Sequence, residues 1–391
     1  MRAFPPLAPL ARVASGALLL IVSASGCAGA QDAGRVRLPD AAERRSAAIP
    51  VALVGESRDD TLFTSITGID VDSRGRIHVG DWTAARVAVL DSTGALVRTV
   101  GRRGLGPGEF RGMGSVQVLP GDSILAYDPA AVRLSVFAPD AEAPAYVLNL
   151  AAALQGPAPL ELRRTHGNDA YLALFRPAFV ASDTAPRKDV LRLLDLEGRP
   201  RGGPLRAFAS RSFLRADGGR SFAVMPNPFG TEGLYALGPG DALHLAWSDS
   251  LGVESTDLAG ARTGGFSAEY EPPAVTPGDV RDAAAALPER MAAAFRPVLA
   301  DSVPERWPAL RALLADDAGR LWLGLNGGSA REAEWAVFAP GGRYLGSVFL
   351  PREVDVRAVR GGRMVGVRTG ETGVPSVVIY RLDAQPGRGR G

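Results

Sequence analysis

The chain has 391 residues, which is enough for two or three average domains unless a repeat fold makes it one large domain. Its 44 basic and 42 acidic residues nearly balance, and removing residues 1–26, which contain two arginines and no acids, leaves 42 of each. This balance excludes the strongly positive surface of a nucleic-acid-binding protein, and a single cysteine excludes an internal disulfide.

The first residues have the order of a secretory signal peptide. Arg2 and Arg12 are the only charges in residues 1–26, an apolar run covers residues 13–22, and small residues follow it. That run is too short to stay in a bilayer as a spanning helix. We therefore expect residues 1–26 to be removed and the mature chain to lie outside the cytoplasm.

Cys27 follows Ala24, Ser25 and Gly26. This tetrapeptide resembles the lipobox of bacterial lipoproteins, and the resemblance implies that Cys27 carries a lipid. Ala24 departs from the leucine that the lipobox prefers, so soluble export after cleavage nearby stays open as the alternative. With the lipid in place, we expect a flexible tether over residues 27–48 and a membrane-anchored lipoprotein at the periplasmic face or the cell surface.

A ten-residue unit occurs twice, at residues 71–80 and 315–324. Each copy contains the end of an apolar strand, a turn that begins with Asp72 or Asp316, and then an alternating strand. Aspartate bonds to nearby backbone N–H groups, and the glycine that ends each turn accepts a positive φ, so both suit a hairpin. Weaker copies, and a second series of turns after apolar strands, indicate units of about four short strands.

Six apolar segments take the place of the third strand in such a unit: residues 86–90, 133–137, 190–194, 252–256, 335–338 and 377–380. Where nothing is inserted, their spacing is roughly 40–50 residues, which is typical of a propeller blade. The sequence therefore predicts an all-β fold, one six-bladed β-propeller over residues 49–383, followed by a disordered tail at residues 384–391. The last unit has room for only three strands, so we expect residues 49–54 to complete it and close the ring.

The gap between blades four and five is longer and has the pattern of helices. Thr276 suits an N-cap and Pro277 the first helical position, and an Ala-rich stretch follows. A second short helix is expected over residues 289–295, because Pro297 comes next. We expect this insertion, about residues 276–299, to pack its apolar stripe on the ring, either over the channel mouth or on the ring's side.

Three segments carry a resemblance to a known family: residues 68–81, the loop 101–112 and residues 306–324. With these segments the chain resembles the six-bladed, NHL-like propeller lipoproteins of several bacterial phyla, over roughly residues 49–383. The resemblance implies the architecture and no particular activity, since this fold serves many unrelated functions.

Several features that suggest chemistry have a simpler structural interpretation. The glycine loop of residues 104–108 lacks the helix that a phosphate site needs, so it is expected to link blades one and two. His78 and His244 share a register that other blades fill with apolar residues, which indicates packing, and His166 is expected in a turn. The spacing of Asp81 and Arg86 recurs in other blades, which indicates hydrogen bonds that fix loops. We predict no metal site, no cofactor and no catalytic residue.

Arginines near the expected inner strands suggest a ligand site: Arg111, Arg163, Arg164, Arg306, Arg311 and Arg357. If several converge at one mouth of the channel, they could receive an anionic sugar or a carboxylate, because guanidinium matches such groups with paired hydrogen bonds. Pairing with neighbouring acids is the alternative. Arg306, Arg311 and Glu232 are the candidate ligand-binding residues.

Two hypotheses about function remain from the sequence. The first is a monomeric, lipid-anchored binding or interaction module of the cell envelope, whose partner is a protein, peptide or glycan; it would contact the membrane through its lipid alone and would bind no nucleic acid. The second is a hydrolase or lyase at the channel mouth, by analogy with propeller lactonases and amidating lyases. Those enzymes need several metal ligands that converge from different inner strands, and the sequence shows no such set.

Overall fold

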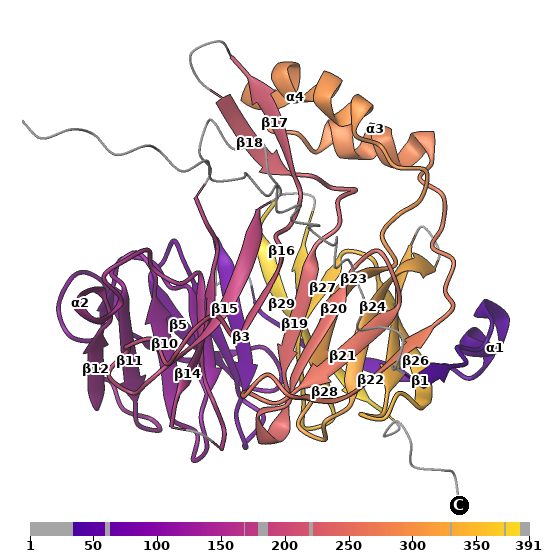
Figure 1. The fold of residues 1–391 in the computed structure, drawn as a ribbon. Coiled ribbons are helices and arrows are strands. Elements are labelled where there is room, and N and C mark those ends of the chain that lie inside the picture. Colours follow the sequence, from indigo (N-terminus) through magenta and orange to yellow (C-terminus); the bar gives the residue numbers. More distant parts are fainter. Residues whose placement is uncertain are drawn as a thin grey trace, which may run out of the picture.

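The computed structural model describes residues 34–58, 63–167, 169–178, 187–218, 222–328, 331–370 and 373–383 (Figure 1). Its large sheets are six antiparallel blades arranged as a ring, so the predicted six-bladed β-propeller is confirmed. The six segments expected as third strands all lie in the third strand of their blade. Cys27 and the expected signal peptide and C-terminal tail lie outside the described residues.

The blades follow one another along the chain, and the first strand of each lies at the central channel. Blade one consists of β3 (Ile66–Val71), β4 (Ile77–Asp81), β5 (Arg86–Leu90) and β6 (Leu96–Val100). Blade two consists of β9 (Ser115–Val118), β10 (Ile124–Asp128), β11 (Arg133–Phe137) and β12 (Tyr146–Asn149). Blade three consists of β13 (Glu161–Arg164), β14 (Tyr171–Phe175), β15 (Lys188–Leu194) and β16 (Arg206–Ala209). A short helix, α2 (Ala151–Leu154), joins blades two and three.

Blades four to six complete the ring. Blade four consists of β19 (Gly233–Leu237), β20 (Leu243–Trp247), β21 (Gly252–Thr256) and β22 (Arg262–Ala268). Blade five consists of β23 (Leu310–Ala315), β24 (Leu321–Gly328), β25 (Glu332–Phe338) and β26 (Tyr344–Pro351). Blade six consists of β27 (Val354–Arg360), β28 (Arg363–Thr369), β29 (Pro375–Leu382) and β2 (Val51–Glu56). The upper face of the ring is defined as the face at which the first strand of each blade begins, and it lies at the top of Figure 1.

Apolar side chains between neighbouring blades form the core. Val87 of blade one packs with Phe137 of blade two, and Trp335 of blade five packs with Val354 of blade six. All four side chains are fully buried. Burying a side chain of this size contributes about 2 kcal/mol, so the interfaces between blades are the main source of stability in a ring without a disulfide.

The ring closes as the sequence predicts. Strand β2, from near the start of the chain, pairs antiparallel with β29, with Val51 opposite Leu382 and Leu53 opposite Tyr380. The last blade thereby gains its fourth strand from the other end of the chain. This closure covers the edge of β29, which would otherwise be free to pair with another molecule.

The structure differs from the flexible tether expected over residues 27–48. Strand β1 (Gly34–Val36) pairs in parallel with β22 at the outer edge of blade four, and helix α1 (Ala41–Ser46) lies against blade five. Arg44 on α1 is buried and pairs with Glu334 of β25, with Nε 2.6 Å from Oε1. Residues 34–48 therefore contact blades four and five of the ring. The sequence pattern did not predict this, because it does not show that Arg44 has a buried carboxylate partner.

A small subdomain stands above the upper face in Figure 1. It consists of the helices α3 (Pro277–Ala285) and α4 (Glu289–Asp301), inserted between blades four and five as expected, and the hairpin β17 (Phe213–Asp217) and β18 (Phe222–Pro226), inserted between blades three and four. We call these four elements the flap. Thr276 caps α3 in a capping box with Asp279, as its sequence indicates.

Two expectations about this insertion are corrected. Helix α4 does not end before Pro297 but continues to Asp301, because burial of Leu299 in the flap offsets the hydrogen bond that the proline lacks. The apolar stripe does not pack on the ring: Phe295 and Leu299 share a core with Leu214 of the hairpin. The hairpin was not expected, and it supplies the apolar surface that the helices need.

Candidate functional site

The features given a structural interpretation from the sequence have that role in the structure. The loop after blade one is held by Glu109, whose Oε2 accepts hydrogen bonds from Leu105 N and Gly106 N at 3.0 and 2.9 Å. Asp81 accepts from Thr83 N and Ala84 N at 3.0 and 3.1 Å and fixes the turn before β5. These carboxylates organise loops.

The three histidines belong to different blades. His78 and His244 are buried within blades one and four, while the ring of His166 is half exposed beside Asp241, after β13. His244 Nδ1 is 2.8 Å from Ser255 Oγ, and burial lowers the pKa of His244 to about 4. Within the described ranges, no group of three or more His, Cys, Asp and Glu side chains has a geometry that could hold a metal ion.

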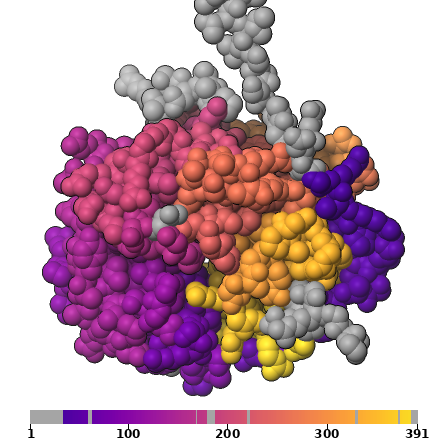
Figure 2. Space-filling view, turned by 60° about the horizontal axis from the view of Figure 1, so that its bottom comes forward, coloured from indigo at the N-terminus to yellow at the C-terminus, as the bar shows by residue number. Residues whose placement is uncertain are grey.

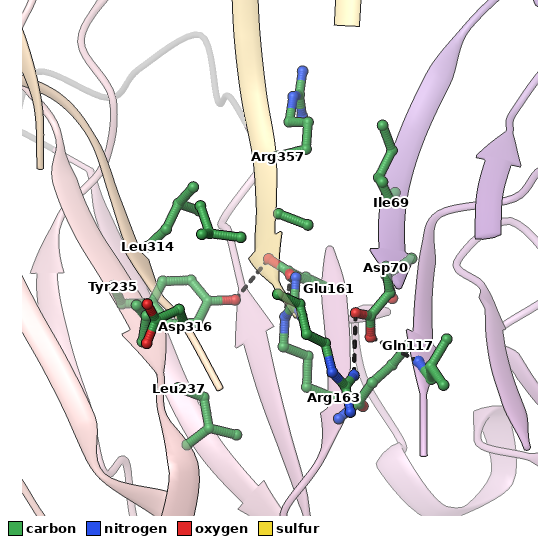
Figure 3. Close-up of a pocket in the computed structure, with 18 of the residues that line it drawn as sticks. Ile69, Asp70, Gln117, Glu161, Arg163, Tyr235, Leu237, Leu314, Asp316 and Arg357 are labelled. Atoms are coloured by element: carbon green, nitrogen blue, oxygen red, sulfur yellow. Dashed lines mark hydrogen bonds and ion pairs between the residues drawn. The ribbon is translucent and has the colours of Figure 1, made fainter. Parts of the chain in front are cut away.

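The main cavity of the described ring is the central channel, with a volume of about 740 Å³. First strands of all six blades line it, and Figure 3 shows that polar side chains project into it from several of them. Trp82 and Leu160 lie at its upper end, and His166 and Gly240 at its lower end. The lower face is hollowed near its centre (Figure 2).

A chain of polar contacts runs along the channel wall between blades three and four. Tyr235 of blade four donates its hydroxyl hydrogen to Glu161 Oε2 at 2.6 Å, and Glu161 Oε1 lies 2.7 Å from Arg163 Nε (Figure 3). Burial alone would raise the pKa of Glu161, but the Arg163 guanidinium and the Tyr235 hydroxyl lower it below its usual range. Glu161 is therefore ionised at neutral pH, and its charge raises the pKa of Arg163.

A second set of polar contacts joins blades six, one and two at the channel wall. Arg360 Nη1 is 3.4 Å from Asp70 Oδ1, and Asp70 Oδ2 accepts a hydrogen bond from Val118 N at 2.7 Å. Arg357, on the same strand as Arg360, pairs with Asp355 at 2.7 Å and lies at the upper end of the view in Figure 3. Three guanidinium groups, those of Arg163, Arg357 and Arg360, thus lie along one cavity.

The structure does not bring the three candidate residues together in one site. Arg306 lies in the segment between α4 and β23, exposed and paired with Glu271 at 2.7 Å. Arg311 on β23 stacks over the Trp335 ring, 5.0 Å from its centre, and burial lowers the pKa of Arg311 to about 10. Glu232 precedes β19 beside other charges, and burial raises the pKa of Glu232 while Arg211 and Arg176 oppose the rise. Arg306, Arg311 and Glu232 therefore have three different environments.

Sequence reasoning missed the residues that do line the channel. Only arginines were considered near the inner strands, whereas Asp70, Gln117, Glu161 and Tyr235 also line the cavity. Of the arginines considered, Arg163 and Arg357 line the cavity. A signal was present: Glu161 and Arg163 alternate with a buried leucine, as residues on the open face of a strand do.

Residues 53–147 match the DUF5128 family model, which is described as a 6-bladed beta-propeller. The family match and the structure agree on the fold. The match covers most of strand β2, all of blade one and most of blade two. No curated protein matches the chain.

Solved structures with similar folds come from several bacteria. A member of the DUF4221 family from Bacteroides vulgatus has a TM-score of 0.51 and 10% identity, over 86% of this chain and 99% of that one. A candidate exported protein from Bacteroides fragilis has a TM-score of 0.47 and 12% identity, over 90% and 98% of the two chains. A virginiamycin B lyase from Staphylococcus aureus has a TM-score of 0.42 and 12% identity, over 85% and 99%. At 10% identity, the likeness to the DUF4221 protein shows the fold alone.

Proposed function

We propose that the protein is an extracytoplasmic binding module of the cell envelope, anchored by a lipid on Cys27, and that its binding site is the central channel. The observation that carries the proposal is the channel of about 740 Å³ lined by paired charges from several blades. This volume is in the range of small-molecule sites, roughly 300–1,000 Å³. The charged side chains of the wall are held by ion pairs on a ring with a buried apolar core, which favours a site that is formed before a ligand arrives.

The upper mouth has the surface that such a site needs for entry. Leu160 is 47% exposed and Trp82 38% exposed, and both line the cavity. An indole at a channel mouth offers a flat surface for the apolar face of a sugar or another ring. The envelope partner, whether a protein, a peptide or a glycan, would present its recognised group at this mouth.

Filling the mouth tests the proposal. Leu160→Trp narrows the entrance, while Leu105→Trp adds the same bulk at a leucine that is 68% exposed on a loop and does not line the cavity. Small molecules and partners that remain bound to the natively purified protein would be identified by mass spectrometry. We expect Leu160→Trp to lose them and Leu105→Trp to retain them. Equal recovery from both variants would exclude the channel as the binding site.

One observation favours the second hypothesis, a hydrolase or lyase. Glu232 is a half-buried carboxyl at the upper end of blade four, and burial raises its pKa, as is common for a general acid or base. Hydrolysis of simple lactones by the purified protein, lost in Glu232→Gln without loss of stability, would support an enzyme. Turnover unchanged in that variant would remove Glu232 from the argument.

A further inference from the structure

The carboxylates that line the channel are already occupied by donors of the protein. Asp70 accepts hydrogen bonds from Val71 N at 2.8 Å and from Val118 N at 2.7 Å, besides its contact with Arg360. Glu161 accepts from Arg163 and from Tyr235. A cationic ligand would have to displace these donors to reach either carboxylate.

The two other acids of the channel wall are occupied in the same way. Asp316 accepts from two backbone N–H groups, from Arg320 Nε at 2.6 Å and from Trp322 Nε1 at 2.9 Å. Asp317 Oδ2 accepts from Gly361 N at 3.0 Å. The acceptors of the wall are therefore engaged in holding turns and blades together.

The guanidinium groups of the channel, in contrast, have more hydrogen-bond donors than their partners in the protein occupy. Each has five N–H donors, and each pairs with one carboxylate: Arg163 with Glu161, Arg357 with Asp355, and Arg360 with Asp70. Their side chains are 38%, 43% and 36% exposed, in that order, so they face the solvent of the cavity. The channel thus offers more hydrogen-bond donors than acceptors to a ligand.

We propose that the channel binds a small organic anion, of the size of an acidic sugar, whose carboxylate pairs with Arg357 at the upper end of the cavity, while the charges of Arg360 and Arg163 along the wall add to the attraction. This inference rests on the proposed binding function and names its ligand class. A carboxylate accepts paired hydrogen bonds from guanidinium, which a neutral hydroxyl group does not match. The sugar ring of such an anion would meet Trp82 and Leu160 at the mouth.

Calorimetric titration of the mature protein tests the ligand class with matched probes. Galacturonate and galactose have the same ring and differ in the carboxylate, and citrate and succinate extend the set of anions. We expect at least one anion to bind with a Kd below about 1 mM, and galactose to bind at least about tenfold more weakly than galacturonate. Absence of binding by all the anions up to about 10 mM would overturn the inference.

Variants locate the binding. Arg357→Gln and Arg360→Gln each remove one guanidinium and are expected to weaken anion binding by roughly tenfold, because a hydrogen bond to a charged group is lost. Arg306→Gln is the matched control, since Arg306 is equally exposed and paired but lies outside the channel. Anion binding that is equal in the double variant Arg357→Gln/Arg360→Gln and in the wild type contradicts the assignment.

The two proposals fail in different ways. If galactose or a quaternary amine such as choline binds better than the anions, and Leu160→Trp abolishes that binding, the channel is a binding site but its ligand is not an anion. If every probe that binds does so equally to Leu160→Trp and to the wild type, the channel itself is not the site.

Discussion

His78 and Trp322 occupy the same place in blades one and five, and each directs a ring nitrogen to an aspartate at the preceding turn. His78 Nε2 is 3.1 Å from Asp72 Oδ2, and Trp322 Nε1 is 2.9 Å from Asp316 Oδ2. Both aspartates are buried and also bind the arginine four positions later at 2.6 Å. The ten-residue unit seen in the sequence is therefore a hydrogen-bonded turn, in which the histidine stands for the tryptophan as a ring N–H donor.

The first prediction concerns this turn. Asp72→Ala should destabilise the protein by about 2–3 kcal/mol, because buried donors on Arg76 and His78 lose their acceptor. Asp91→Ala is the control, since Asp91 holds a similar backbone turn at the surface without a ring or arginine partner, and it should cost about 1 kcal/mol. Urea unfolding measures both, and equal losses would show that the buried partners contribute nothing.

The histidines should affect stability and bind no metal. Replacing His78 or His244 by Leu or Gln should change the free energy of unfolding by roughly 1–2 kcal/mol, as substitutions at the edge of a core commonly do. Zinc bound in a one-to-one ratio in the wild type and absent from either variant would refute this role.

His244 also predicts a dependence of stability on pH. Its pKa in the folded protein is about 4, below the value of 6.5 for a free histidine, so the unfolded chain binds a proton that the folded protein does not. The stabilisation is fully present above pH 6.5 and is lost as the pH falls toward 4, with a difference of roughly 3 kcal/mol. Unfolding of His244→Gln should be less sensitive to pH over this window than unfolding of the wild type, and an equal pH dependence of the two would contradict the assignment.

The sequence predicts the features that depend on neighbours along the chain. The third strands, the closing strand β2 and the capped helix α3 all have local patterns that the structure confirms. What it does not predict depends on partners far apart in the chain. Arg44 and Glu334 are 290 positions apart, and Glu161 and Tyr235 are 74 apart. No periodicity relates such pairs, so the docked N-terminal segment and the polar channel emerge only in the folded ring.

The buried pair of Arg44 and Glu334 should hold residues 34–48 on the ring. Arg44→Ala leaves the Glu334 carboxylate buried without its cation, and we expect a loss of about 3–5 kcal/mol and faster proteolysis before β2. Arg45→Ala removes the adjacent arginine, which pairs with Glu332 at the surface, and should cost below about 1 kcal/mol. If the two variants are equally stable, the segment is not held by this pair.

Membrane anchoring should depend on Cys27 alone. We expect Cys27→Ala to move the protein from the membrane fraction to the soluble fraction, with the melting temperature of the ring unchanged, because residue 27 precedes the blades in the sequence and offers the only thiol for a lipid. None of the helices in the described ranges is long and apolar enough to cross a bilayer. Retention of the variant on membranes after a high-salt wash would point to another anchor.

The last prediction concerns the flap. Both insertions of the flap return to the ring at the upper face, where β19 and β23 begin. Trp82 and Leu160 line the channel mouth on that same face. The flap has its own core around Phe295, and Phe229 at its base stacks with Trp307, with ring centres 4.9 Å apart. A body with its own core, joined to the ring by short segments, can change its distance from the mouth without unfolding.

We therefore expect a bound galacturonate to slow hydrogen exchange in α3 and α4, and Phe295→Ala to remove that effect by loosening the flap core. The variant should lose about 3–5 kcal/mol of local stability in the flap, while the blades keep their protection. Leu214→Ala, on the hairpin side of the same core, should act in the same way. If ligand binds but exchange in α3 and α4 does not change, the flap does not contact the channel, and its helices and hairpin serve only to bury each other.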